Sequence, residues 1–133
     1  MNTNPIQMKK IAILLALTIV IISCEKDNND LLVGKWKLVE GFNIMAGGKY
    51  SIPVQEQRIE EYTKKLRIIY DFEGNEVARS NYDATETMVT VNGINEDGKT
   101  WSFSFEYSLQ NDTLKLNHDG GFESYSEYLV RTE

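Results

Sequence analysis

Cysteine and histidine, two side chains that commonly act as nucleophile, base or metal ligand, each occur once in this 133-residue sequence. The histidine, His118, stands beside Asp119 among turn-forming residues. A catalytic triad also needs a nucleophile and a buried acid that orients the histidine, and no motif marks either of them. Zinc sites need three or four ligands, usually His or Cys, which the chain does not hold. We therefore expect no catalytic residues, no cofactor and no metal site.

The cysteine, Cys24, follows a segment unlike the rest of the chain. Lys9 and Lys10 precede an apolar run at residues 11–22. That run is shorter than the roughly 20 residues of a membrane-spanning helix and is typical of the apolar part of a secretory signal. A single cysteine also excludes an intrachain disulfide.

Residues 21–24, Ile-Ile-Ser-Cys, resemble the lipobox of bacterial lipoproteins, in which the chain is cut before the cysteine and the thiol carries lipid. The resemblance implies that residues 1–23 are a lipoprotein signal peptide and that Cys24 is acylated, with fatty acids such as palmitate. It also implies an exported protein held in the bacterial envelope, at the outer membrane on its periplasmic or its surface face. The alternatives are an ordinary signal peptide with a stray cysteine and an N-terminal membrane anchor.

An acidic segment, Glu25 to Asp30, comes next and contains no apolar residue. Such a segment cannot pack into a core, so we expect residues 24–33 to form a solvated tether. It is also similar to the surface-export tethers of some Gram-negative lipoproteins, and a plain linker is the alternative.

The overall composition limits the range of partners. With 41% hydrophobic and 26% charged residues, the chain is an ordinary globular protein of one domain. Its net charge is −6 and it has no basic stripe, so we expect no nucleic-acid partner. Contact with the membrane is expected through the acylated cysteine.

Beyond Leu31, short segments that alternate apolar and polar residues are separated by turn signals, which predicts an antiparallel sheet. The clearest segment is residues 101–110, which puts five large apolar side chains on one face: Trp101, Phe103, Phe105, Tyr107 and Leu109. Further strands are expected at residues 34–44, 65–72, 76–82, 85–93, 113–118 and 122–132. The first of these places on one face Trp36, Leu38, Phe42 and Ile44. The second places on one face Leu66, Ile68, Tyr70 and Phe72.

A sheet of at least seven strands without covering helices must protect its edges, and closure does so. We predict an all-β fold, a small antiparallel up-and-down barrel of seven or eight strands that occupies residues 34–133. Residues 45–65 break the alternation with glycines, Pro53 and helix-tolerant residues. There we expect a long loop with a short helix or an extra strand.

The ends of the predicted barrel resemble those of lipocalins. Gly34, Lys35 and Trp36 match the G-x-W motif that opens the first lipocalin strand, and Arg131 matches the arginine of the last strand that packs over that tryptophan. The late segments LQNDTLKL and EYLVR are similar to bacterial lipocalin-like lipoproteins, although the chain is shorter than a typical lipocalin. The resemblance implies a barrel closed by Gly34, Trp36 and Arg131, often with a small apolar ligand.

The aromatic face of residues 101–110 has two interpretations. It is either the wall of a ligand pocket, together with Leu66, Ile68 and Tyr70, or part of a filled core, since an eight-stranded barrel has room for one or the other. The first interpretation predicts a non-enzymatic, lipid-anchored module that binds a small apolar or amphipathic molecule. The second predicts a structural or interaction accessory of an envelope protein complex.

Overall fold

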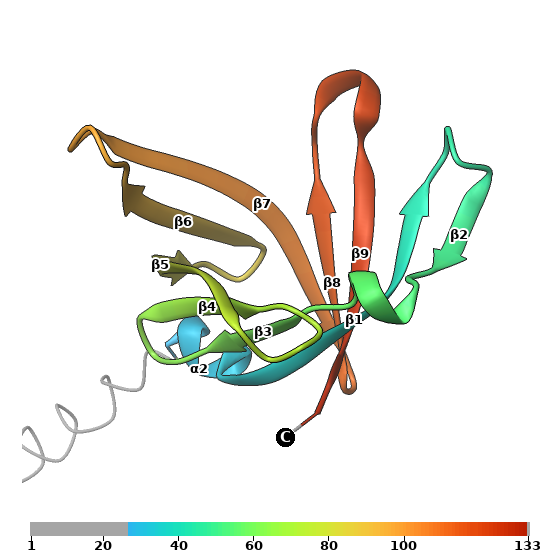
Figure 1. Ribbon diagram of the computed structural model, residues 1–133, viewed down its shortest axis with the longest axis horizontal. Helices are drawn as coiled ribbons and strands as arrows, with labels where there is room; N and C mark the ends of the chain where they lie inside the picture. Colours follow the sequence, from blue (N-terminus) through green and yellow to red (C-terminus); the bar gives the residue numbers. More distant parts are fainter. Residues whose placement is uncertain (1–26, 133) are drawn as a thin grey trace, which may run out of the picture.

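The computed structural model describes residues 27–132 and confirms the predicted all-β fold. Eight antiparallel strands form a closed barrel, and one further strand, β2, extends beside it (Figure 1). The elements in chain order are α2 (Asn28–Leu32), β1 (Gly34–Asn43), β2 (Gly48–Ser51), η1 (Val54–Glu56), β3 (Ile59–Tyr62), β4 (Leu66–Tyr70), β5 (Glu76–Ala84), β6 (Met88–Ile94), β7 (Thr100–Gln110), β8 (Thr113–His118), η2 (Gly121–Glu123) and β9 (Tyr125–Arg131).

Strand β1 closes the barrel because it pairs along one side with β9 and along the other with two strands in succession. Residues 34–37 pair with β3, and residues 40–43 pair with β2. Strand β2 therefore lies outside the cycle in which every strand from β3 to β9 pairs with the next.

A β-bulge in β1 changes the alternation of its side chains. The register against β9 shifts between Leu38 and Glu40, so Val39 is one residue extra. Beyond the bulge, Phe42 no longer shares the face of Leu38. The expectation that these two residues belong to one apolar face is therefore wrong, because simple alternation does not survive an inserted residue.

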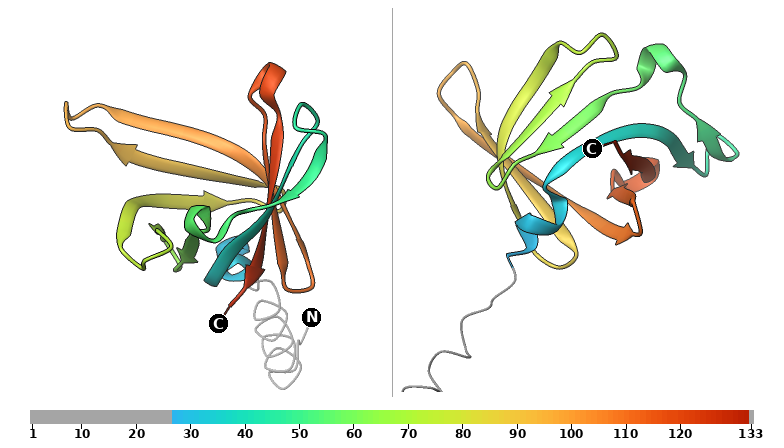
Figure 2. Two further views of the ribbon diagram at one scale, coloured as in Figure 1. Left: turned by 45° about the vertical axis from the view of Figure 1, so that its right-hand side comes forward. Right: turned by 90° about the horizontal axis from the view of Figure 1, so that it is seen from below.

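The two ends of the barrel differ. What we call the closed end carries α2, the end of β9 and the short turns at residues 63–65, 85–87 and 111–112. What we call the open end carries the turns at residues 44–47, 71–75, 95–99 and 119–124. The hairpins β1–β2, β6–β7 and β8–β9 spread apart from one another towards the open end (Figures 1 and 2).

The apolar core lies towards the closed end. Tyr62 and Tyr82 meet edge to face there, with ring centroids 5.1 Å apart. Helix α2 and all barrel strands except β4 contribute to this buried cluster. The cluster comprises Leu32, Trp36, Leu38, Tyr62, Tyr82, Val89, Val91, Phe105, Tyr107, Leu114, Leu116 and Leu129. The interior towards the closed end is therefore filled by the barrel's own side chains.

Helix α2 plugs the closed end and belongs to the folded domain. Leu32 is fully buried in the core. Asn29 is also buried, and its side chain joins two turns: Nδ2 donates to the carbonyl of Lys64 (2.9 Å), and Oδ1 accepts from the amide of Ala84 (2.7 Å). The expectation of a solvated tether through residue 33 is therefore wrong for α2. Polar Asn29 is buried because it satisfies backbone groups of distant turns.

Trp36 and Arg131 meet at the closed end. They are opposite each other in the β1–β9 register, and the guanidinium carbon of Arg131 lies 4.1 Å from the centre of the indole. The indole Nε1 donates to the carbonyl of Leu32 (2.8 Å), and Arg131 Nη1 donates to the carbonyl of Val33 (2.9 Å). This pair therefore fixes the end of α2 against the barrel.

Residues 45–65 contain more regular structure than their composition indicates. They hold β2, one turn of 3₁₀-helix at η1 and the barrel strand β3. The short helix and the extra strand were expected as alternatives, and the structure contains both, as η1 and β2, whereas the barrel strand β3 was not expected. Its side chains facing the interior include the charged Glu60, so β3 lacks the apolar alternation typical of a barrel strand.

Candidate binding site at the open end of the barrel

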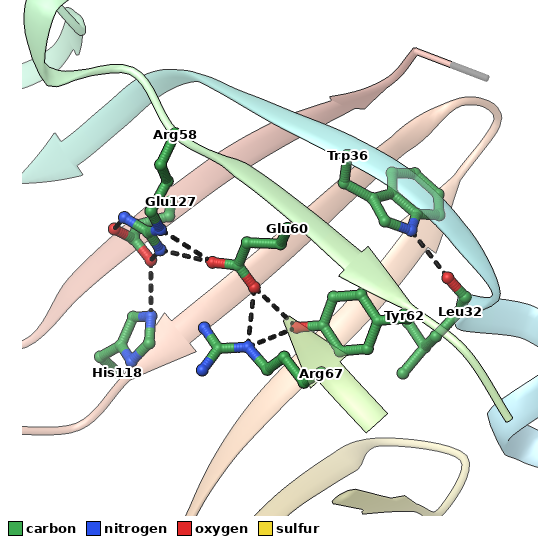
Figure 3. A network of polar contacts seen from close by, with 8 residues as sticks. All are labelled: Leu32, Trp36, Arg58, Glu60, Tyr62, Arg67, His118 and Glu127. Carbon is green, nitrogen blue, oxygen red and sulfur yellow. Dashed lines mark hydrogen bonds and ion pairs between the residues drawn. The ribbon is translucent and has the colours of Figure 1, made fainter. Parts of the chain in front are cut away.

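A network of charged side chains lies inside the barrel, on the open-end side of the apolar core. It joins β3, β4, β8 and β9, and Figure 3 shows its members converging from these strands. The network comprises Arg58, Glu60, Tyr62, Arg67, His118 and Glu127. Buried charges are stable only when paired and hydrogen-bonded, so the contacts of each carboxylate decide what the network can do.

Glu60 is completely buried and has two donors on each carboxylate oxygen. Arg58 donates to Oε1 from Nε (2.9 Å) and Nη2 (2.6 Å), while Tyr62 Oη and Arg67 Nε each donate to Oε2 at 2.8 Å. Burial alone raises the pKa of Glu60, but attraction to Arg67 and Arg58 outweighs it and holds the pKa below its usual range. Glu60 is therefore an anion that anchors two arginines.

Glu127, on β9, is the second carboxylate of the network. Its oxygens accept from Arg58 Nη1 and Nη2, both at 2.8 Å, and Oε2 lies 2.9 Å from His118 Nε2. Burial alone raises the pKa of Glu127, but the hydrogen bonds with His118 and Arg58 outweigh it and lower the pKa to about 2. Arg58 thus links β3 to β9 through one carboxylate on each strand.

An aromatic wall, defined as Trp101, Phe103 and Phe105, runs along the interior face of β7 from the open end into the core. Successive ring centroids are 6.3 Å and 5.5 Å apart. Trp101 and Phe103 are 40% and 47% exposed, whereas Phe105 is 2% exposed. One face of a single strand therefore changes from core to surface within two residues.

The wall continues across the interior onto β8 and β9. The His118 ring lies 5.2 Å from the Phe105 ring and stacks on Tyr125 at 4.6 Å. The His118 side chain is only 15% exposed and is held between two aromatic rings and Glu127. His118 ends β8 and is not a solvated turn residue.

A pocket of about 460 Å³ opens where β7 and β8 separate. The two strands pair only from Glu106 and Asn117 towards the closed end, and β7 residues nearer the open end have no partner on β8. Apolar, hydroxyl and carboxylate groups border the pocket, which is lined by Phe42, Ile44, Met88, Ser104, Phe105, Glu106, Asn117, His118, Asp119, Ser124, Tyr125 and Ser126.

Strand β4 places the expected pocket residues on its other face. Tyr62 and Arg67 are opposite each other in the register, and Arg67 Nε donates to Tyr62 Oη (3.1 Å), so Arg67 faces the interior. Leu66, Ile68 and Tyr70 occupy the alternate positions and lie on the opposite face. The expectation that these three side chains line the interior is therefore wrong, because ion pairing with Glu60 outweighs the apolar pattern.

The remaining residues predicted from sequence fall into three groups. Trp101, Phe103, Phe105 and Tyr107 do share one face of β7, and the last two are buried. Gly34, Trp36 and Arg131 lie at the closed end, and none of them lines the pocket. Cys24, the expected lipidation site, lies outside the described residues.

Sequence reasoning missed the charged network altogether. Glu60 was interpreted, with Glu61, as part of a solvated face, and Arg58, Arg67 and Glu127 were not singled out, because charged side chains are rarely buried. The polar side chains of Arg58, Glu60 and Tyr62, at every second position, were the available signal, since alternation in a strand marks one face whatever its chemistry.

Comparisons of this chain with protein-family models, with curated proteins and with solved structures found no match. Within residues 27–132, no three His, Cys, Asp or Glu side chains gather closely enough to hold a metal ion. In the same part of the chain, no helix is long and apolar enough to cross a membrane.

Proposed function

We propose that this protein is a non-enzymatic binding module, anchored to the bacterial envelope by lipid on Cys24, that holds a small apolar or amphipathic molecule at the open end of its barrel. The exposure of Trp101 and Phe103 carries this proposal. Both rings continue a core face of β7 beyond the point where packing ends. Phe105, on the same face, lines the pocket of about 460 Å³, and Trp101 lines a second pocket of about 410 Å³ together with Asn92 and Gly93.

The energetic argument rests on the apolar surface left in water. Burial of apolar surface contributes about 25 cal/mol per Å², and large aromatic side chains offer about 150–250 Å² each. Trp101 and Phe103 keep close to half of their surface exposed although the strand that carries them reaches the core. An apolar ligand that covers both rings recovers that free energy.

The position of α2 supports an anchored orientation. The chain enters the described domain at Asp27 and passes directly into α2 at the closed end. The open end therefore lies opposite the end at which the described chain begins, three residues after Cys24 in the sequence. This arrangement leaves the aromatic wall accessible to molecules that arrive from outside the anchoring membrane.

A titration with a neutral apolar probe tests the binding function. A chain of residues 25–133 keeps every described contact and lacks the acyl chains that disturb lipid assays. We expect saturable one-to-one binding of N-phenyl-1-naphthylamine, weakened about tenfold by Phe103→Ser through loss of apolar contact. Phe72→Ser is the matched control, since Phe72 is 54% exposed at the open end, against 47% for Phe103, but lies outside the aromatic wall. Equal loss in both variants, or no saturable binding, contradicts the proposal.

Metabolic labelling with a fatty acid tests the anchor separately. Cys24→Ser removes the thiol that accepts lipid, so we expect no label and an uncleaved precursor. Label retained in the Cys24→Ser protein would sink the lipoprotein assignment.

The second candidate function is a protein-interaction accessory of an envelope complex, with no small ligand. It is favoured by large apolar side chains at the tips of the open end, where Ile44, Met45 and Ile94 are each more than 70% exposed. The probe titration separates the two candidates, since an accessory without a pocket binds no probe saturably.

A further inference from the structure

Arg67 makes only part of the hydrogen bonds available to it. Its side chain is nine-tenths buried, and its Nε donates to Glu60 and to Tyr62. Its two terminal nitrogens, Nη1 and Nη2, have no partner among residues 27–132. Figure 3 shows both of them pointing away from Glu60 and Tyr62, without a contact.

The neighbouring groups cannot supply the missing partners. All three nitrogens of Arg58 are used on Glu60 and Glu127. The oxygens of Glu60 have two donors each, and Glu127 is shared between Arg58 and His118. The acidic groups of the network are therefore satisfied, whereas Arg67 keeps a charged and unused donor pair.

That donor pair remains accessible from the interior. No fully enclosed side-chain nitrogen or oxygen in the described part of the chain lacks a hydrogen-bond partner, so Nη1 and Nη2 must each reach an accessible space. The guanidinium carbon lies 5.5 Å from the centre of the Phe105 ring. The donors are thus at the base of the aromatic wall, where the core ends.

We propose that Nη1 and Nη2 of Arg67 bind the carboxylate of a single-chain amphiphile whose apolar chain lies along Phe105, Phe103 and Trp101. This inference rests on the proposed binding function and specifies its ligand class. A guanidinium presents two parallel N–H donors that match the two oxygens of a carboxylate, and the bond strengthens where water is excluded.

The guanidinium is already oriented for this task. The hydrogen bonds from Arg67 Nε to Glu60 and Tyr62 fix the orientation of the planar guanidinium. Nη1 and Nη2 lie on the other side of the group from these two partners. A fixed donor loses little conformational entropy when a ligand arrives, so more of the interaction energy appears as affinity. A neutral head group offers weaker hydrogen bonds to the same donors.

The first experiment compares head groups on the unmodified sequence of residues 25–133. Decanoate and 1-decanol share an apolar chain and differ in charge, and calorimetric titration gives the affinity of each. We expect decanoate to bind about 10- to 100-fold more tightly, which is the range of a hydrogen bond to a charged group.

The second experiment uses Arg67→Lys, which keeps a positive charge for Glu60 and removes the two-nitrogen fork. Its single ammonium remains engaged with Glu60 and Tyr62, so decanoate affinity should fall to that of 1-decanol while 1-decanol affinity stays unchanged. Arg79→Lys is the matched control, because Arg79 is an exposed arginine paired with Glu76. Thermal unfolding verifies that each variant is folded, and the head-group comparison stands on its own if Arg67→Lys is not.

The outcomes separate this inference from the proposed function. Equal affinity for decanoate and 1-decanol, or a carboxylate preference that persists in folded Arg67→Lys, overturns the role of Arg67 and leaves the apolar site standing. Binding of neither molecule overturns both. A preference lost in Arg67→Lys and kept in Arg79→Lys supports the assignment of the carboxylate to Arg67.

Discussion

The closed and open ends of this barrel use aromatic side chains in opposite ways. At the closed end, Trp36 is fully buried beneath Arg131 and bonded to α2, whereas at the open end Trp101 is 40% exposed. A glycine makes room for the Trp101 ring: Gly93 is opposite Trp101 in the register, and a Cβ added at Gly93 would overlap the indole. Packing is therefore concentrated at the closed end, whereas aromatic surface stays exposed at the open end.

The largest expected effect tests this comparison directly. Trp36→Ala should lower the free energy of unfolding by about 3–5 kcal/mol, because it leaves a cavity in the core. Trp101→Ala should cost about 1 kcal/mol, since half of its surface is already in water. Urea unfolding of the two variants measures both values. Similar losses would mean that the open end contributes to stability as much as the closed end.

Acid should act on the charged network between the two ends. The pKa of Glu127 is about 2 in the folded protein against an ordinary value of 4.5, so the unfolded state binds a proton first as the pH falls. Stability from Glu127 is present above pH 4.5 and is lost between pH 4.5 and about 2, by up to about 3 kcal/mol.

Urea unfolding across that pH range checks the effect of acid. Glu127→Gln should flatten the loss, whereas Glu86→Gln, an exposed control at the closed end, should leave it as it is. An unchanged acid dependence in Glu127→Gln contradicts the assignment to this carboxylate.

Two asparagines bond to the backbone at opposite ends of the barrel. Asn29 is buried and joins two closed-end turns, so Asn29→Ala should cost about 1–3 kcal/mol by leaving backbone groups unsatisfied. Asn95 stabilises an exposed open-end turn by accepting from the amide of Lys99 (2.8 Å), and Asn95→Ala should cost less than about 1 kcal/mol. Thermal unfolding compares the two, and the reverse order would count against α2 as part of the folded domain.

The smallest expected effect concerns the contact between Trp36 and Arg131. A double-mutant cycle with Trp36→Leu and Arg131→Ala should give a coupling energy of about 0.5–1 kcal/mol, as for a partly exposed cation over an aromatic ring. Leucine keeps the core partly filled, so the cycle isolates the contact. Additive effects in urea unfolding would show that the guanidinium and the indole are neighbours without energetic consequence.

Much of the fold could be predicted because strand alternation and turn chemistry are local. Residues 101–110 were expected as a strand and lie within β7, and the Asp97-Gly98 turn forms with Gly98 at a φ of +76°. The bulge at Val39 and strand β3 could not be predicted in this way. The bulge depends on the partner strand β9, and β3 lacks the apolar pattern on which strand assignment rests.

The candidate site was predictable only in its apolar part. The aromatic wall follows from period-two spacing, which any extended strand converts into one face. The charged part depends on contacts between distant segments: Arg58 and Glu127 are 69 residues apart along the chain, and neither reveals the other in the sequence. The inward position of Arg67 follows from the same contacts, since a buried arginine needs a carboxylate partner, which Glu60 supplies.

Neighbouring residues along the chain are enough to place most of the strands and turns of this protein and to show which aromatic side chains of β7 share a face. How much of that face is buried depends on the tertiary structure. The pairing of β7 with β8 stops at Glu106, so Tyr107 is enclosed by the barrel while Trp101 and Phe103 extend past its packed interior. Burial depends on where the neighbouring strands end, and that is set by the register of the whole barrel.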